Sequence, residues 1–444
     1  MMKPHNFEER LIWYSIITTY GLYFLGAQAF VLPMIAWLLV LYLYKQLWGQ
    51  TKDNFVGKEI TIPFATWLWI SSIIIMLFAL IVAHGNFELG TIRLIKSILK
   101  WSREIALWGL FPLIGLLNIR KQLLYRAACI LCLQSLVYML IGYLAFFLNL
   151  PSRLYLSPLY KLGGNSPQLY DVVLYMVDYQ NPNIPRLPFF APWPPNMAFV
   201  GIIYFFIVCQ ESNRNWRLMG MAGAIAMVIT PYSRSAILCF PITILLTWIL
   251  TNFTRPVLHL TSSIGCFLTG IFATQLINLL GTSTELFNST RASSSSVRLA
   301  SIRISLDRWW NEAPIWGHGT PNLSEPLFVG PSLEFVGRIF LGTGGCGTWV
   351  NLLYTKGLVG FIAFAVPFIW SFMSLLNKAQ KSPTAKAGLS ILLAFFFFSF
   401  VEELDQLAYI YWPGLLMIGI ALKEEVPASV SVVTNERNLV LRSE

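Results

Sequence analysis

Charged residues, histidines and cysteines are all scarce in this sequence. Only 12% of its 444 residues are Asp, Glu, Lys or Arg, while 56% are hydrophobic. This composition leaves too little polar surface to cover two or three water-soluble domains, so a soluble globular protein is excluded. Cys129 and Cys132 have the CxxC spacing, but they lie in an apolar run without polar ligand residues beside them. We expect this pair to pack as small hydrophobic side chains, and we expect neither a metal nor another cofactor.

Long, uncharged apolar runs are abundant instead. The longest, from Leu11 to Tyr44, is long enough for two membrane-crossing helices with a tight turn near Gly26. We predict an all-α polytopic membrane protein, one membrane domain over residues 1–444, with about twelve transmembrane helices. The predicted spans are 11–25, 29–44, 62–82, 105–117, 127–148, 197–209, 218–229, 235–250, 256–279, 357–376, 387–401 and 407–422.

Basic residues in the short connecting segments predict the orientation of these spans. Lys and Arg recur in alternate connections, for example at Lys45, Arg120 and Lys378, and such residues are retained on the cytoplasmic side of a membrane. Both termini, including the tail 423–444, are therefore expected in the cytoplasm. The segments expected on the outer side are an interfacial helix at 84–104, a loop at 150–196 and a large, partly helical loop at 280–346.

The outer segments contain many basic residues, which the topology rule does not explain. In the segment 84–104, four of them recur at offsets of 3, 7 and 10, which places them on one stripe of a helix. This helix is expected either to rest on anionic lipid headgroups or to bind a phosphorylated lipid. Several arginines in the large loop would suit an anion with many oxygens, such as a phosphate. These residues are Arg93, Lys96, Lys100 and Arg103 in the helix, and Arg291, Arg298, Arg303 and Arg308 in the loop.

Three stretches resemble a known family. They are "YSRSA" around Arg234, "SIRISLDRWWNEAPIWGHG" at 301–319 and "TWVNLLYTKGLVGF" at 348–361. With the twelve-span layout, they resemble the O-antigen ligase and O-antigen polymerase superfamily of bacterial envelope glycosyltransferases. Two outer loops also resemble a polymerase pattern in which ten residues separate an arginine from a glycine. The matching pairs are Arg153 with Gly164 and Arg308 with Gly319.

The resemblance implies an activity, a location and partners. Members of this superfamily take a glycan carried on undecaprenyl diphosphate and transfer or polymerise it onto an acceptor glycan or glycolipid. The chain would then be a metal-independent, inverting membrane glycosyltransferase of cell-surface polysaccharide biosynthesis. It would lie in the bacterial inner membrane and act at the periplasmic face. Its partners would be the lipid-linked donor, the acceptor and membrane lipids, with no nucleic acid, while the sugar, the acceptor and the choice between ligase and polymerase stay open.

The site expected from the sequence combines arginine, tryptophan and histidine side chains. Arginines would hold the departing diphosphate, where negative charge develops, and a base would activate the acceptor hydroxyl. Ligases of the family place a histidine just before the span after the large loop, where this chain has glycines and Cys346. His318 is therefore the candidate catalytic base, and carboxylates are the alternatives. The candidate diphosphate ligands are Arg234, Arg303, Arg308, Arg153 and Arg186. The tryptophans expected to contact sugar or the lipid interface are Trp309, Trp310 and Trp316. The alternative bases are Glu312, Glu325 and Glu334, and a separate acidic cluster consists of Glu402, Glu403 and Asp405.

Two other functions are compatible with the sequence. An exporter or flippase of a lipid-linked or anionic glycan would also have many spans and basic outer loops. Transporters, however, place ionisable groups and broken helices near the middle of the membrane, often in repeated halves, and the sequence has neither a duplicated half nor much charge within its apolar runs. The missing family histidine also suits a non-catalytic relative that assists glycan assembly.

Overall fold

Helices make up most of the described chain. The computed structural model describes residues 3–50, 61–163, 167–178, 181–253, 292–320 and 347–424, with a few isolated positions between 255 and 272. The helices are α1 (Phe7–Ile17), α2 (Thr19–Leu25), α3 (Gln28–Gln50), α4 (Phe64–Asn86), α5 (Thr91–Arg103), α6 (Leu107–Ile114), α7 (Lys121–Phe147), α8 (Tyr160–Gly163), α9 (Pro194–Val208), α10 (Arg214–Ile229), α11 (Arg234–Asn252), α14 (Ala292–Glu312), α15 (Gly347–Ala379), α16 (Pro383–Ser399) and α17 (Ala408–Lys423), with short 3-10 helices η1 (Pro167–Tyr170) and η3 (Leu404–Leu407).

The outer loop predicted at 150–196 contains small β-sheets, which the all-α prediction did not include. Strands β1 (Arg153–Leu156) and β2 (Asp171–Val173) pair antiparallel, as do β3 (Met176–Asp178) and β4 (Asn181–Arg186). Each strand is too short, and its apolar pattern too irregular, to be recognised from sequence periodicity. The sheets therefore add to a fold that is otherwise mostly helical.

Five of the described helices are long and apolar enough to cross a membrane. They are α3, α4, α7, α11 and α15. Their outward residues include many large exposed hydrophobic side chains, for example Met34, Ile74 and Leu140, as expected for surfaces in contact with lipid. Helices coincide with eleven predicted spans, but several are short, and 256–279 lies almost entirely outside the described residues. The chain is thus membrane-associated by its apolar helices, and the count of twelve spans stays a prediction.

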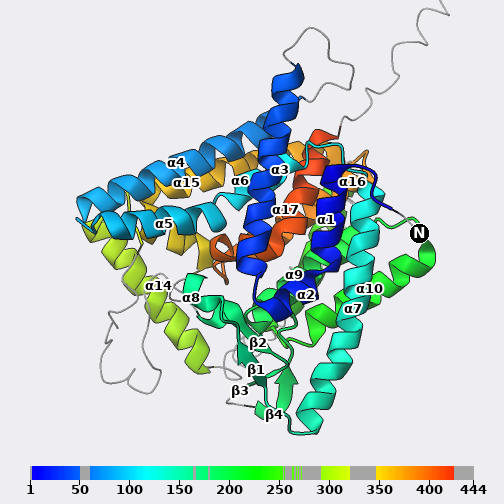
Figure 1. Ribbon diagram of the computed structural model, residues 1–444. Helices are drawn as coiled ribbons and strands as arrows, with labels where there is room; N and C mark the ends of the chain where they lie inside the picture. The colour runs from blue at the N-terminus through cyan, green and yellow to red at the C-terminus, as the bar shows by residue number, and fades with distance from the viewer. Residues whose placement is uncertain are drawn as a thin grey trace, which may run out of the picture.

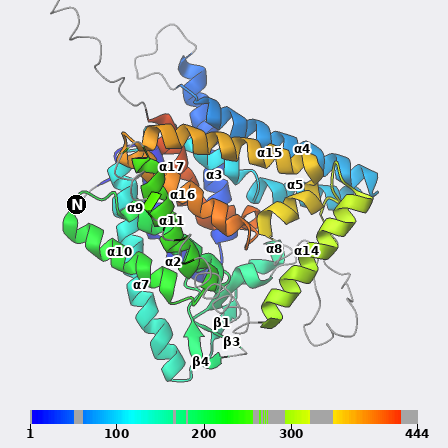
Figure 2. The ribbon, with the colours of Figure 1, turned by 180° about the vertical axis from the view of Figure 1, so that it is seen from behind.

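The centre of the molecule is formed by helices that are apolar on every side. α6, α9, α16 and α17 are buried along almost their whole length, as expected for helices surrounded by other helices. Figure 1 shows them between α1, α3 and α7 on one side and the pair α4 and α15 on the other, and Figure 2 shows α10 and α11 from behind. α6 and α17 approach so closely that a Cβ on Gly419 would lie 2.2 Å from Pro112 O. Only glycine permits that contact.

Ion pairs fasten the end of the molecule that was predicted to be cytoplasmic. Arg120 donates to both carboxylate oxygens of Glu9 at 2.7 Å, and Arg126 pairs with buried Glu211 at 2.9 Å. The hydrogen bonds from Arg120 hold the pKa of Glu9 at about 2, well below its usual range. Arg120, one of the residues that predicted the orientation, thus also joins two parts of the chain, as do its neighbours Lys121 and Arg126.

We use the term loop face for the end of the molecule that contains α5, the four strands, α14 and residues 313–320. In Figure 1, α5 and α14 lie at the left and the four strands at the bottom. The predicted outer segments 84–104, 150–196 and 280–346 supply all of them. Any site made by the outer segments therefore lies at the loop face.

α15 is a helical hairpin, not one straight helix. Gly357 has φ 63 and ψ −165, a conformation that breaks the helix into residues 347–356 and 358–379. Trp349 in the first half packs against Phe361 and Phe368 in the second, with ring centroids 5.3 and 6.1 Å apart. In a straight helix Trp349 and Phe368 would be roughly 28 Å apart, at about 1.5 Å per residue. The first half therefore folds back along the second, and the predicted span 357–376 begins at the fold.

Candidate functional site

The stretch 308–319 leaves α14 and packs into the break in α15. A broken helix leaves backbone groups without partners, which is costly in a membrane unless other protein groups satisfy them. Here the loop 313–319 satisfies four of them. The bonds run from Leu358 N to Pro314 O at 2.9 Å, from Val359 N to Ile315 O at 3.2 Å, from His318 N to Tyr354 O at 2.9 Å and from Gly319 N to Thr355 O at 2.9 Å.

Two glycines allow this close approach of loop and helix. Gly317 and Gly319 both have φ 71, which L side chains rarely adopt. A Cβ on Gly317 would lie 2.4 Å from Lys356 N, and one on Gly319 would lie 2.9 Å from a ring nitrogen of His84. The "GHG" sequence is therefore required by the packing of the loop against α15 and α4.

His318, the predicted base, is held on both ring nitrogens. Its Nε2 lies 2.9 Å from Glu312 Oε2, and its Nδ1 lies 3.1 Å from Tyr354 O. The ring stacks on Tyr354 at 4.5 Å and lies beside Phe87 at 5.0 Å. Neither nitrogen is open toward a substrate in this arrangement, which favours an anchoring role for His318. Its role as a base stays a prediction.

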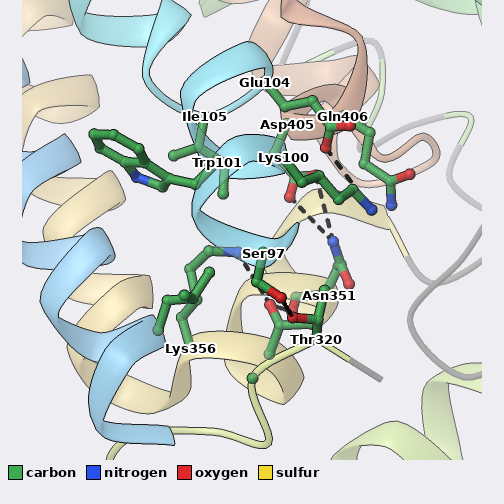
Figure 3. A pocket seen from close by; sticks show the side chains of 13 residues that line it. Ser97, Lys100, Trp101, Glu104, Ile105, Thr320, Asn351, Lys356, Asp405 and Gln406 are labelled. Carbon is green, nitrogen blue, oxygen red and sulfur yellow. Dashed lines mark hydrogen bonds and ion pairs between the residues drawn. The ribbon is translucent and has the colours of Figure 1, made fainter. Parts of the chain in front are cut away.

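A small cavity lies directly behind this loop. Its volume is about 50 Å³, enough for a few water-sized groups but not for a sugar chain. Figure 3 shows its walls, which come from α5, the first half of α15, η3 and the end of the 313–320 loop. The polar side chains that line it include Ser97, Lys100, Glu104, Thr320, Asn351, Lys356 and Asp405.

The cavity contains buried charges of both signs. Lys356 is only 5% exposed and Asp405 only 4%, and Asn351 Nδ2 donates to Asp405 Oδ2 at 3.1 Å. Within the described residues, Lys356 Nζ has one hydrogen bond, to Thr355 Oγ1 at 3.2 Å, and no carboxylate oxygen within 4.0 Å. Burial raises the pKa of Glu104 to about 7, although nearby Lys100 lowers it in part.

The fold explains how a lysine can be buried at this place. Lys356 is the last residue before the break, so it lies at the C-terminal end of the first half of α15. The carbonyl groups at that end carry partial negative charge, which stabilises a cation. A buried ammonium that lacks a close carboxylate partner is nevertheless expensive, so such a residue most often has a functional reason.

Two of the hydroxyl residues that line the cavity, Ser97 and Thr320, are also bonded to a buried histidine. His84, buried near the end of α4, has its Nδ1 2.8 Å from Leu80 O and its Nε2 3.0 Å from both Ser97 Oγ and Thr320 Oγ1. The two hydroxyls are also in hydrogen-bond contact with each other. Because a backbone carbonyl can only accept, Nδ1 carries the proton and Nε2 accepts from a hydroxyl.

The predicted arginines lie in three places and do not form one cluster. Arg303 is exposed on α14, and Arg308 lies on the same helix with Glu312 4.0 Å away. Arg186 donates to Pro231 O at 2.9 Å, which brings it to the turn that begins α11 at Arg234. The fifth, Arg153, is paired with Asp171 at 2.5 Å.

The predicted acidic cluster is divided between two environments. Asp405 lines the cavity, whereas Glu402 accepts from Arg298 Nη2 at 3.0 Å. Burial raises the pKa of Glu402, and Arg298 partly opposes this. One member of this cluster, Glu402, is thus paired with an arginine.

The predicted tryptophans also have separate environments. Trp309 Nε1 donates to Pro314 O at 2.9 Å, and Trp316 packs edge-on against Phe78 at 5.7 Å. Trp310 is 69% exposed. Two of the three therefore hold the loop in place, and Trp310 is available for sugar or lipid.

Sequence reasoning singled out Lys100 and Asp405 for other roles and missed the other polar residues of the cavity and the histidine behind it. Lys356 offered a signal, since it is a lone lysine directly before a glycine in an otherwise apolar stretch. His84 and Ser97 offered none, because their pairing with Thr320 depends on the loop. Among the described residues, no group of three or more His, Cys, Asp or Glu is arranged to hold a metal ion. No known protein-family model matches the chain, and no curated protein is significantly similar to it in sequence.

Proposed function

We propose that the protein transfers a glycan from undecaprenyl diphosphate to an acceptor glycan or glycolipid, with the cavity behind the 313–320 loop as the reaction site. The observation that supports this proposal is the buried ammonium of Lys356, next to Lys100 and to the carboxylates of Glu104 and Asp405. A departing diphosphate needs positive charge where negative charge develops, and lysines can provide it without a metal. Attack from the face opposite the diphosphate inverts the anomeric centre.

The size of the cavity limits what it can hold. At about 50 Å³ it accommodates the reacting phosphate oxygens and an acceptor hydroxyl, so lipid and sugars extend outside it. The exposed apolar side chains of α5, Ile92, Ile95 and Leu99, suit the polyprenyl chain, because an amphipathic helix with a basic edge binds at the lipid interface. Arg303 and Trp310, exposed on α14, suit the sugars.

Export of a lipid-linked glycan is the second candidate, and one observation favours it. α15 is broken beside a buried charge, as in many transporters. The break, however, lies at one end of the span: the second half has about 22 residues, or roughly 33 Å, which is the full thickness of the hydrocarbon core. A site at the edge of the membrane suits surface chemistry better than passage through the middle.

The test is release of undecaprenyl diphosphate by the purified protein from an undecaprenyl-diphosphate glycan, with and without candidate acceptors. Lys356→Met should lower the rate about 10- to 150-fold, because a charge-assisted hydrogen bond contributes about 1.5–3 kcal/mol. Lys381→Met, at an exposed lysine between α15 and α16, is the matched control and should leave the rate unchanged.

One result would count against the proposed site, and two others would count against transfer itself. Full activity of Lys356→Met removes the proposed site. Movement of the intact donor across a liposome membrane, without release of undecaprenyl diphosphate, supports export. Donor binding with neither release nor movement supports a non-catalytic relative.

A further inference from the structure

The hydrogen-bonded group His84, Ser97 and Thr320 has a feature that structural packing does not require. His84 is only 3% exposed, yet its Nε2 faces two hydroxyls, Ser97 Oγ and Thr320 Oγ1, that both line the cavity. The hydroxyls thus connect a buried imidazole with the space next to Lys356. Packing alone requires only that the buried Nε2 accept one hydrogen bond; here it meets two hydroxyls, and both also line the cavity.

The orientation of the imidazole fixes the direction of proton movement. Leu80 O, 2.8 Å from Nδ1, is the carbonyl of the preceding helical turn and can only accept, so the proton of the neutral ring resides on Nδ1. The lone pair of Nε2 then points at the hydroxyl pair. In this arrangement Thr320 can pass its proton to His84 while it receives another from a group in the cavity.

We propose that His84 is the proton acceptor of the transfer reaction and acts through the hydroxyls of Thr320 and Ser97. This inference rests on the proposed function. The acceptor sugar hydroxyl would give its proton to Thr320 Oγ1, whose own proton passes to His84 Nε2. Meanwhile the acceptor oxygen forms its bond to the anomeric carbon, and the bond from that carbon to the diphosphate oxygen breaks. The diphosphate leaves with the electron pair, next to Lys356, and His84 later releases the proton to water.

We call this path from the acceptor hydroxyl through Thr320 and Ser97 to His84 the relay. It also explains why the 313–320 loop must lie so close to α4 and α15. Thr320 follows Gly319, whose lack of a Cβ lets the chain pass the His84 ring at van der Waals distance. Thr320 reaches His84 only because the loop is held in the break of α15. The rival base His318 does not line the cavity, and Glu312 and Tyr354 O occupy both of its ring nitrogens.

The first test compares two histidine substitutions. His84→Gln should lower kcat for release of undecaprenyl diphosphate by a factor of about 10² to 10⁴, as for loss of a general base, with donor KM within about twofold of the parent. His5→Gln, an identical change at an exposed histidine near the N-terminus, should change neither constant. Full turnover by a folded His84→Gln protein overturns the relay.

The second test examines the hydroxyls and does not depend on how well His84 variants fold. Thr320→Ser retains the oxygen and should retain most of the turnover, whereas Thr320→Val, similar in shape, should lose it at least tenfold. Equal turnover by the serine and valine variants overturns the relay, because a packing role would favour valine.

A third measurement separates proton transfer from space filling. His84→Ala should regain turnover with added imidazole, and less with a halogenated, weakly basic imidazole of similar shape. Equal rescue by both compounds means that the ring only fills space and overturns the relay. If the parent protein with donor and acceptor releases no undecaprenyl diphosphate, the proposed function itself fails; if the parent is active and the variants are too, only the relay fails.

Discussion

Replacement of Gly357 by alanine should disrupt the packing of the 313–319 loop against the break in α15. An added Cβ would lie 2.2 Å from Ile315 O and 2.6 Å from Gly317 N. Both are backbone atoms, so no flexible side chain can move aside. The backbone conformation, φ 63 with ψ −165, is itself one that only glycine adopts readily, at a cost of about 1–3 kcal/mol for another residue.

The expected loss of stability follows from these terms. To relieve the overlap, the loop must withdraw and give up the hydrogen bonds from Leu358 N and Val359 N, each contributing about 1 kcal/mol. With the backbone strain, the total is about 3–5 kcal/mol, a large part of the roughly 5–15 kcal/mol that stabilises a typical folded protein. Lys356 precedes Gly357 and Thr320 ends the loop that would withdraw, and both line the cavity, so the cavity should open as well.

The assay is thermal unfolding in detergent, combined with release of undecaprenyl diphosphate. Gly357→Ala should lower Tm clearly and abolish release, while Gly21→Ala is the control, because a Cβ there meets nothing within 4 Å and alanine favours a helix. Gly317→Ala removes the same contact from the opposite side, so the double variant should cost much less than the sum of the two single ones. An unchanged Tm in Gly357→Ala, or strict additivity with Gly317→Ala, would refute the idea that loop and helix lock each other.

Two further predictions concern charge. Between about pH 4.5 and 7 the folded protein keeps a proton on Glu104 that the unfolded chain releases, so the stability of the parent should fall as the pH rises through that window. Glu104→Gln should remove this dependence, so its stability relative to the parent should be higher at pH 8 than at pH 5, by up to about 3 kcal/mol. Measurement of Tm for both proteins at both pH values tests this. If Arg234 and Arg308 contact the diphosphate, as the sequence predicts, even Arg→Lys should slow release at each position, because a lysine cannot reproduce the bidentate fork of a guanidinium; normal release by both variants would remove them from the site.

The sequence predicted the positions of the helices better than the contacts between the elements. Apolar runs located the helices because lipid-facing and core helices both need them, and the predicted start of a span at Gly357 coincides with the fold in α15. The hairpin itself was not predictable, since an apolar stretch of 33 residues looks like one long helix. The strands of 150–196 were missed because their pairing depends on register across the loop, not on periodicity.

The candidate site was only half predictable for a related reason. Motif spacing singled out the "GHG" stretch, and the structure does place it at the cavity, but as backbone that fills the break in α15. The side chains around the cavity come from segments far apart in the chain: Ser97 on α5, Lys356 on α15 and Asp405 on η3. No local pattern joins the three, although Asp405 lies in the acidic cluster of the sequence, so sequence spacing had no means to group them.

The break in α15 and the buried charge beside it depend on one another. A continuous helix would satisfy the carbonyls of Tyr354 and Thr355 internally and would offer the loop no partner. Once the helix is broken, those carbonyls must be paired, and the amides of His318 and Gly319 pair them. That pairing sets the next residue, Thr320, at the cavity, and the same break places Lys356 at a helix C-terminus that tolerates its charge. A continuous helix would avoid both costs, and this is the reason for which we propose that chemistry takes place at this position.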